Sequence, residues 1–325
     1  MSAPLEGIRV ADFGRYIAGP FCAALLADLG ADVIRIEKRD GREDRTLVPL
    51  AENDDGSPRE GAMFLQMNRN KRSLTLDPMT DEGREVLSVR AEKLPTVDLF
   101  DLDTGQGKRS TFLDLTKPAD AEALRVLARD AHVFVDSYRP GALRELGVTP
   151  AALAHASPGI IYLAISCYGH KGPWAQRRGW EQLAQSATGL ALDQGTFNAM
   201  RAGTRRETVP QLIPAAACDY ITGYLAAAGV AAALLRRMRE GGSWVVEVSL
   251  CATAMWLQSL GKIADAHVAE GWKPGAGLDL YFQSCETTKG RLDFLGPVVR
   301  MSRTPPAWQR PPPEPGADEA RWLAA

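Results

Sequence analysis

Residues 8–37 constrain the fold more than any other part of the chain. A β-branched stretch, IRVADF, is followed by the loop GRYIAGP, an apolar helical stretch, FCAALLADLG, and a second strand pattern, DVIRIEK. A strand, a helix and a strand in this order form a β-α-β unit, whose two strands lie parallel in one sheet. The sequence therefore predicts an α/β fold built on a parallel sheet.

The rest of the chain continues this alternation. Alternating or continuous apolar runs predict strands, and apolar residues at helical spacing predict helices. Further strands are expected at 132–136, 160–166 and 244–250, and helices at about 79–92, 119–130, 178–190, 219–238 and 251–270. The charged residues 41–62 are expected to form a long surface loop, and the proline-rich tail from residue 304 an extended segment.

Two segments of the chain resemble each other. Residues 68–87 and 105–127 share the order KRS, two further residues, LD and then a helical stretch. Each copy is predicted to form a turn, a strand and a helix. A local duplication of one β-α unit and a functional basic loop both explain the similarity, and the residues alone leave both open.

Composition argues against several classes of protein. With 325 residues, 45% of them hydrophobic, the chain is long enough for two domains. A net charge of -2 gives no overall field that would attract nucleic acid or an anionic membrane. The five cysteines lack metal-binding spacing, which predicts a reducing compartment and no metal site. The N-terminus lacks a signal-peptide pattern and apolar runs such as 225–235 are short of a bilayer span, so we expect a cytoplasmic protein.

The ends of the first two strands suggest a phosphate-containing ligand. Glu37 ends the second strand where an acidic ribose ligand would lie in a dinucleotide fold. The first turn, DFGRYIAGP, lacks the G-x-G-x-x-G spacing that lets a backbone approach a pyrophosphate, which argues against a nicotinamide cofactor. Arg15, Lys38 and Arg39 are candidate phosphate contacts, although solvated surface is the alternative for each of them.

A glycine-rich loop follows the strand at 160–166. Gly169, Gly172 and Pro173 favour turns that expose amide groups, at the end of a parallel strand where α/β sheets bind ligands. His170 is a candidate acid or base there, and a surface residue otherwise. The loop therefore predicts a ligand-binding edge of the sheet.

Charged and polar side chains continue this segment. Arg177 and Arg178 form a candidate anion-binding pair. Glu181 and Gln185 are four residues apart, so they share one face of the predicted helix.

Asp219 stands at the start of an alanine-rich helix, in the stretch AACDYITGY. Aspartate is a favoured N-cap, because its carboxylate accepts a hydrogen bond from an amide in the first helical turn. Gly223, Ala227 and Gly229 permit close approach of another backbone, which predicts a buried helix. A buried carboxylate is costly to desolvate, and that cost makes it a candidate nucleophile. Residue chemistry alone leaves the cap and the nucleophile equally open.

Several segments resemble, in the same order, the class III CoA-transferases of the CaiB/BaiF family. This family includes formyl-CoA transferase, carnitine CoA-transferase and the α-methylacyl-CoA racemases. The resemblance covers about residues 5–252. It rests on the segments LEGIRVADFGRYIAGPFCAALLADLGADVIRIEK, NRNKRSLTLD, HVFVDSYRPGALRELGV, YGHKGPW with WEQLAQSATG, and CDYITGYLAAAGVAAALLRR.

The resemblance implies an α/β large domain with a Rossmann-like parallel sheet, a reduced second domain and an interlinked homodimer. On this basis residues 1–215 form the CoA-binding domain, 216–285 a helical segment with the shortened second domain, and 286–325 a segment that returns to the large domain. Family members are longer, and the stretch 270–300 is brief for a full second domain.

The same resemblance assigns roles to individual residues. Asp219 matches the aspartate that attacks acyl-CoA, forming an acyl-aspartyl anhydride and then an aspartyl-CoA thioester, before a carboxylic acid takes the CoA. No tightly bound cofactor and no metal are implied, only a CoA thioester as substrate. Matching positions for CoA contact are Arg15, Lys38, Ser137, Ala142 and Arg178. Oxyanion or loop roles are expected for Gly169, His170, Gly172 and Glu181.

Two alternatives remain open. A racemase of this family uses a histidine and an aspartate as its two bases, and the histidine position here holds Trp180 or Gly179. Losing one base disables a two-base proton transfer, which favours the transferase. A divergent, non-catalytic CoA-binding protein is the second alternative.

Overall fold

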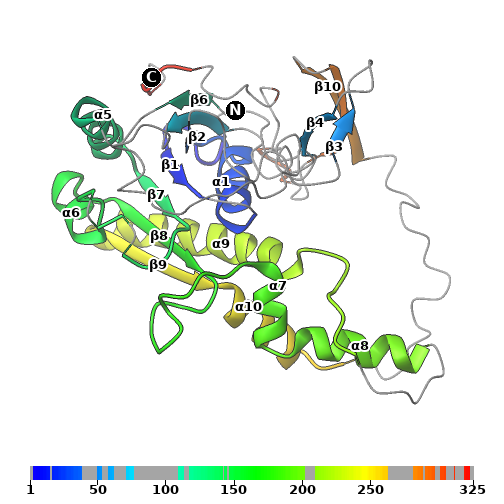
Figure 1. The fold of residues 1–325 in the computed structure, drawn as a ribbon. Coiled ribbons are helices and arrows are strands. Elements are labelled where there is room, and N and C mark those ends of the chain that lie inside the picture. The colour runs from blue at the N-terminus through cyan, green and yellow to red at the C-terminus, as the bar shows by residue number, and fades with distance from the viewer. Residues whose placement is uncertain are drawn as a thin grey trace.

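A computed structural model of the chain places the elements of this fold (Figure 1). It describes residues 3–14, 17–38, 50–52, 58–61, 71–76, 109–112, 117–141, 143–144, 146–201, 209–262, 281–287, 290–296, 301–304, 311 and 318–322. The predicted helix at 79–92 lies outside these residues.

The described strands form a seven-stranded sheet in the order β5-β6-β2-β1-β7-β8-β9. Every neighbouring pair in it is parallel, which confirms the predicted α/β class. The strands are β1 (Arg9–Phe13), β2 (Asp32–Lys38), β5 (Lys71–Leu76), β6 (Arg109–Phe112), β7 (Val133–Asp136), β8 (Ile161–Ser166) and β9 (Trp244–Ser249).

Two antiparallel hairpins lie outside this sheet. One pairs β3 (Leu50–Glu52) with β4 (Pro58–Gly61), and the other pairs β10 (Phe282–Thr287) with β11 (Gly290–Leu295). The expectation of a strand-free surface loop over 41–62 is therefore wrong at β3 and β4. Their backbones satisfy each other by pairing, which local polarity did not reveal.

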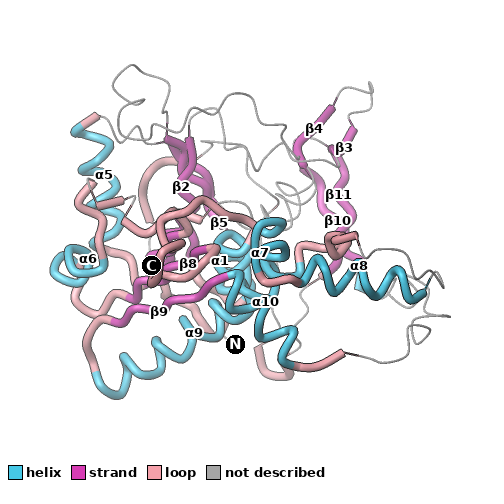
Figure 2. The backbone as a smooth tube through the Cα atoms, turned by 60° about the horizontal axis from the view of Figure 1, so that its bottom comes forward, coloured by secondary structure: helices cyan, strands magenta, loops and turns pink. Residues whose placement is uncertain are grey.

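The described helices follow the predicted order, with shifted ends. They are α1 (Ala18–Asp28), α5 (Pro118–Arg129), α6 (Pro150–Ala156), α7 (Glu181–Ala187), α8 (Leu190–Arg201), α9 (Ala217–Glu240) and α10 (Leu250–Ser259). The helix expected at 178–190 begins only at Glu181 and stops before Gly189, whose φ of 81° suits glycine. Figure 2 shows α8 extending away from the sheet beyond this break.

The two faces of the sheet are covered by different helices. Alternate residues of β1 point to opposite sides: Val10 joins the core beneath α1 and α9, and Ala11 joins the core beneath α5 and α6. β7 follows the same alternation with Val133 and Phe134. The result is a three-layer arrangement, in which α9 and β9, although they follow residue 215, complete the same layers as β1 and α1.

The packing of α1 against α9 depends on a small residue. A Cβ added at Gly223 would lie 2.7 Å from Cδ1 of Phe21 and 3.1 Å from the carbonyl oxygen of Ala18. Phe21 also meets Tyr220 edge to face, with ring centroids 4.9 Å apart. By length and composition α9 could span a membrane, with half of its most apolar stretch buried inside the protein. Its contacts with α1, β9 and α10 are those of a core helix.

The two similar segments place strands side by side. β5 and β6 are parallel neighbours, and Arg72 pairs with Arg109 and Ser73 with Ser110, so the shared KRS motifs are in register. Both strands also pair with β2. The strand predicted in each copy is therefore confirmed.

The C-terminal residues contact the layer of α5. The indole nitrogen of Trp322 donates a hydrogen bond to the carbonyl oxygen of Leu127, at 3.1 Å. The guanidinium of Arg9 lies 5.7 Å from the centre of the Trp322 ring. Residues 318–322 thus fasten the chain end to the sheet and to α5.

Candidate active site

Asp219 lies in the first turn of α9, and only 6% of its surface is exposed. The helix begins at Ala217 with Ala216 as its N-cap residue, and no side chain of that residue caps the turn. The prediction that Asp219 is the N-cap is therefore wrong, because the helix starts two residues earlier than expected. Its carboxylate is not used to satisfy the amides at the N-cap.

Glu181 caps this helix instead, from the first residue of α7. Its two carboxylate oxygens accept one hydrogen bond each: Oε1 from the amide of Cys218, at 3.1 Å, and Oε2 from the amide of Asp219, at 2.7 Å. Glu181 is itself 5% exposed. A buried carboxylate from a distant element thus satisfies amides that a helix start leaves without a partner.

Gln185 holds Glu181 in place, as their shared helix face predicted. Its amide nitrogen donates to Oε1 of Glu181 at 2.7 Å, and its side-chain oxygen accepts from the amide of Ile213 at 2.8 Å. Gln185 is 1% exposed. The turn that carries Asp219 is therefore fixed by α7 and by the segment that leads into α9.

Two effects raise the pKa of Asp219 well above the ordinary aspartate value. Burial disfavours the charged form, and the negative charge of Glu181 acts in the same direction. The start of the helix therefore does not offset the cost of ionising this carboxylate. The amides that would stabilise its charge bind Glu181 instead.

The first turn of α1 faces the turn that carries Asp219. Ile17 and Phe21 form an apolar cluster with Ala216 and Tyr220, one residue away from Asp219. Ser137, at the end of β7, lies against the same turn of α1, since a Cβ added at Gly19 would be 2.9 Å from its hydroxyl oxygen. Asp219 and Ser137 thus both adjoin the start of α1.

The other residues expected to contact CoA are placed less completely. Arg15 and Ala142 lie outside the described residues, as does the side chain of Lys38, whose backbone ends β2. Arg178 is exposed in the loop before α7. Its neighbour Arg177 lies over the ring of Trp174, with its guanidinium carbon 4.8 Å from the ring centre.

The glycine-rich loop adopts the turns that its sequence predicts. Gly169 and Gly172 have φ values of 87° and 91°, in the region that favours glycine. The amide of Gly169 already donates to the hydroxyl of Ser166, at 3.0 Å, and so is engaged within the loop. The carboxylate of Glu181 accepts hydrogen bonds, so it is not an oxyanion donor.

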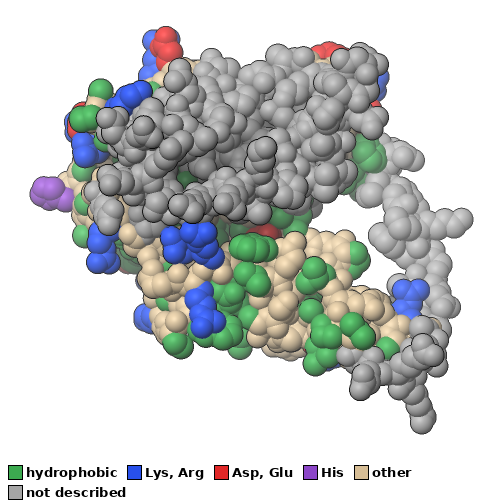
Figure 3. All heavy atoms as spheres, in the orientation of Figure 1, with side chains coloured by type: hydrophobic (Ala, Val, Ile, Leu, Met, Phe, Trp, Pro, Cys, Tyr) green, Lys and Arg blue, Asp and Glu red, His purple; other side chains and the backbone are tan. Residues whose placement is uncertain are grey.

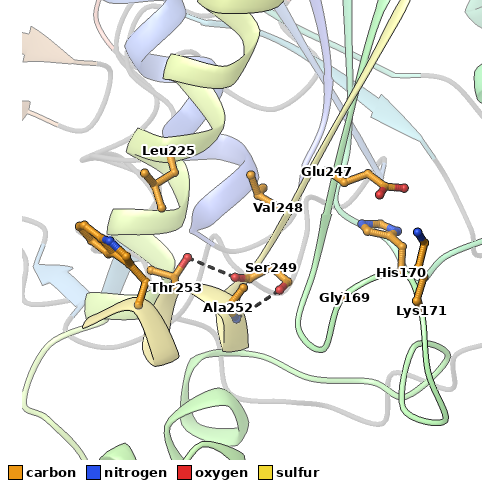
Figure 4. Close-up of a pocket in the computed structure, with 10 residues that line it drawn as sticks. Gly169, His170, Lys171, Leu225, Glu247, Val248, Ser249, Ala252 and Thr253 are labelled. Atoms are coloured by element: carbon orange, nitrogen blue, oxygen red, sulfur yellow. Dashed lines mark hydrogen bonds between the residues drawn. The ribbon is translucent and has the colours of Figure 1, made fainter. Parts of the chain in front are cut away.

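His170 lines a cavity of about 520 Å³ at the end of β9 (Figure 4). The close-up shows His170 and Lys171 beside Glu247, with Leu225 and Thr253 on the other side. The hydroxyls of Thr253 and Thr222 are 2.6 Å apart, and Thr222 lies one helical turn after Asp219. The cavity wall is therefore connected to the catalytic candidate through α9.

Among the described residues, no group of three or more histidine, cysteine or acidic side chains could hold a metal ion. The cap by Glu181 was missed from the sequence. Glu181 and Gln185 gave a local signal through their spacing, but the amides that Glu181 binds lie 37 and 38 residues further on.

The fold and the buried aspartate agree with a match to a protein family. The model of CoA-transferase family III matches residues 5–93 and 97–279. The chain therefore belongs to CoA-transferase family III.

Named relatives of the chain are CoA-transferases. It is 30% identical over 256 residues to the probable fatty acyl-CoA transferase Rv3272 of Mycobacterium tuberculosis, covering 79% of this chain and 52% of that protein. It is 31% identical over 251 residues to a formyl-CoA:oxalate CoA-transferase of Escherichia coli, covering 77% and 48%. It is 27% identical over 295 residues to mouse succinyl-CoA:glutarate CoA-transferase, covering 89% and 56%. The chain spans about half the length of these relatives.

Solved structures share the fold. The crystal structure of Rv3272 from M. tuberculosis matches with a TM-score of 0.59 and 28% identity, covering 80% of this chain and 58% of that one. A CaiB/BaiF family protein from Brucella suis matches with a TM-score of 0.61 and 24% identity, covering 90% and 65%.

Proposed function

We propose that this protein transfers CoA between an acyl-CoA thioester and a free carboxylic acid, with Asp219 as the nucleophile. The observation that carries the proposal is the buried carboxylate of Asp219, with its backbone amide bound by Glu181 and Glu181 held by Gln185. Family membership supplies the reaction class, and the relatives named above are transferases.

The first chemical step uses the ionised form of Asp219. A carboxylate oxygen attacks the thioester carbon, and collapse of the tetrahedral intermediate expels CoA as a thiolate and leaves an acyl-aspartyl anhydride. The CoA thiolate then attacks the aspartyl carbon, which releases the first carboxylate and leaves an aspartyl-CoA thioester. The incoming carboxylate repeats the two steps in reverse order and leaves as the new acyl-CoA.

Burial of Asp219 changes the relative stability of its charged form and of the covalent intermediates. Its raised pKa means that the charged form is poorly stabilised in the free site, so bond formation relieves an unfavourable charge. The anhydride and the thioester are both uncharged at the aspartyl group. A site that disfavours the carboxylate therefore favours the covalent intermediates.

The ligand and assembly proposals follow from the resemblance. We place CoA along the edge of the sheet near the start of α1, with Ser137 adjoining that turn and Arg178 as an exposed cation of the loop. Figure 3 shows hydrophobic side chains on the surface over α7, α8 and α10. Exposed apolar residues there, including Met200, Met255 and Trp256, support a homodimer that covers this face.

Substitution of Asp219 by asparagine tests the proposal. Asn keeps the shape but has no ionised oxygen, so we expect the rate of CoA exchange to fall by a factor of about 10³ or more. The matched control is Asp130→Asn, which removes an exposed carboxylate at the end of α5. Full activity in Asp219→Asn with an unchanged circular dichroism spectrum would overturn the nucleophile assignment and leave a non-catalytic role for this residue.

The racemase alternative has a separate test. The position that would need a histidine holds Trp180 or Gly179, and neither an indole nor a glycine is a base. We therefore expect no deuterium at the α-carbon of a branched acyl-CoA after incubation in D₂O. Deuterium incorporation that depends on Asp219 would favour the racemase.

A further inference from the structure

Two cysteines meet beside the catalytic candidate, where β8 ends and α10 begins. Cys167 directly follows β8, and Cys251 is the second residue of α10. The amide of Cys251 donates to the carbonyl oxygen of Cys167 at 2.9 Å, just beyond the last register pair of β8 and β9, Ser166 with Ser249. Cys167 belongs to an apolar core cluster, and Cys251 packs against the same cluster. One direct backbone hydrogen bond keeps the two Cα atoms within roughly 6.8 Å of each other, the upper end of the range over which a disulfide joins two Cα atoms.

The side chains of this pair interact as well as the backbones. The thiols of Cys167 and Cys251 lie close enough to interact, and this interaction raises the pKa of Cys167 and lowers the pKa of Cys251. Cys251 is half-buried and Cys167 is buried. Cys251 also sits in the first turn of a helix, where the dipole favours a thiolate. Cys251 is thus the accessible, more acidic thiol, and Cys167 is its neighbour within reach.

We propose that Cys167 and Cys251 form a reversible redox switch, in which hydrogen peroxide joins them in a disulfide beside Asp219. The Cys251 thiolate attacks one peroxide oxygen, the O–O bond breaks, and a sulfenic acid forms while the second oxygen leaves as water after taking up a proton. The sulfur of Cys167 then attacks the sulfenic sulfur, and the hydroxyl leaves with the Cys167 proton as a second water. The two thiols lose two electrons in total, and the peroxide gains them.

The contacts of Cys167 connect this switch to the active site. Its thiol donates to the carbonyl oxygen of Trp180 at 3.8 Å. A Cβ added at Gly179 would lie 2.4 Å from its sulfur, so Cys167 packs directly under the backbone that leads into Glu181. A disulfide removes the thiol hydrogen and draws the sulfur toward Cys251. The start of α7, which carries the cap of the Asp219 helix, then loses this support.

Cys218 is the competing partner, and its contacts argue against it. Its thiol is hydrogen-bonded to Glu181, and Cys251 influences it only through charge. Cys285 lies on β10 and is half-buried like Cys251. It provides a matched control, because it has similar exposure in a different element.

Peptide mapping of the full chain tests the proposal without reference to activity. Under native conditions with a small excess of hydrogen peroxide, we expect a mass loss of about 2 Da, one hydrogen from each thiol. A non-reduced digest should contain the Cys167–Cys251 peptide pair, and the pair should still form in Cys285→Ser and be lost in Cys251→Ser. A bond from Cys251 to Cys218, a disulfide between two chains, or oxygen addition without the pair would overturn the proposal. The peptide map of the wild-type protein tests for the Cys167–Cys251 disulfide even if the serine variants fail to fold.

A second experiment measures how oxidation changes catalysis, and this experiment rests on the proposed function. Oxidation should lower the rate of CoA exchange at least about tenfold, and a thiol reductant should restore it. Cys285→Ser should respond like the wild type, whereas Cys251→Ser should keep its activity in peroxide. Formation of the disulfide with unchanged exchange would contradict the link to α7. A chain that exchanges no CoA before oxidation would overturn the proposed function, and the peptide map would still decide the disulfide.

Discussion

At the scale of single residues, Asp219 combines burial with a cost in stability. Its pKa is raised in the folded chain and ordinary in the unfolded chain. Below the ordinary value both states hold the proton and nothing is lost. As the pH rises through the raised pKa, the folded state resists ionisation that the unfolded state undergoes freely, so stability falls. Ionisation of the proposed nucleophile therefore costs stability.

This sign predicts that Asp219→Asn is more stable than the wild type at alkaline pH. Asparagine cannot ionise, so the variant avoids the loss. The difference in melting temperature should widen as the pH rises from the ordinary aspartate pKa, about 4, to the raised pKa of the folded chain. Differential scanning calorimetry across that range measures it. An equal or lower melting temperature for the variant at the alkaline end would contradict the raised pKa.

Glu181 is expected to set the acid limb of the activity profile. Glu181→Gln removes the negative charge that helps to raise the pKa of Asp219, so this limb should move to lower pH. Stability should fall by about 1–3 kcal/mol, because the glutamine NH₂ group would face one of the two amides that the carboxylate now satisfies.

The pH dependence of the rate measures the shift of the acid limb in Glu181→Gln. Chemical denaturation of the same variant measures its loss of stability. Glu240→Gln is the control, since Glu240 lies at the far end of α9 and forms only an exposed ion pair with Arg236. A shift of the limb to higher pH in Glu181→Gln would contradict this role.

At the scale of elements, the crossing of α1 and α9 holds the site together. Gly223→Ala places a methyl group 2.7 Å from the ring of Phe21 and 3.1 Å from a backbone oxygen, so one helix must shift. Overpacking of this kind costs about 1–3 kcal/mol. Urea denaturation should show the loss, and Leu225→Ala, an exposed position on the same helix, should show much less. Equal effects at the two sites would contradict the close approach.

Elements with a local sequence pattern could be predicted, whereas contacts between residues far apart in the sequence could not. The strands β1, β2, β7 and β8 could be predicted, because their alternating or continuous apolar side chains are buried in the two cores beneath the helices. The start of α9 and the cap of this helix could not be predicted, because Glu181 reaches the amides of Cys218 and Asp219 only through tertiary packing. The pairing of β3 with β4 was missed for a similar reason, since their polar sequence gave no alternation.

At the scale of the whole molecule, residues 318–322 pack against elements from much earlier in the chain. Trp322→Ala removes the hydrogen bond to Leu127 and the contact with Arg9, and should lower the free energy of unfolding by about 2–4 kcal/mol. Val126→Ala is the control, because that side chain is 45% exposed on the same helix, α5. Equal losses in urea denaturation would contradict a fastening role for residues 318–322.

Covalent catalysis by Asp219 is tested by trapping the two intermediates proposed for this residue. The protein is incubated with an acyl-CoA, quenched separately with hydroxylamine and with borohydride, digested and analysed by mass spectrometry. An acyl anhydride or CoA thioester on Asp219 predicts a hydroxamate in the first sample and a reduced alcohol in the second, both on the peptide that contains residues 217–224. Unmodified peptide in both samples, from protein that exchanges CoA at a measurable rate, would contradict covalent catalysis by Asp219.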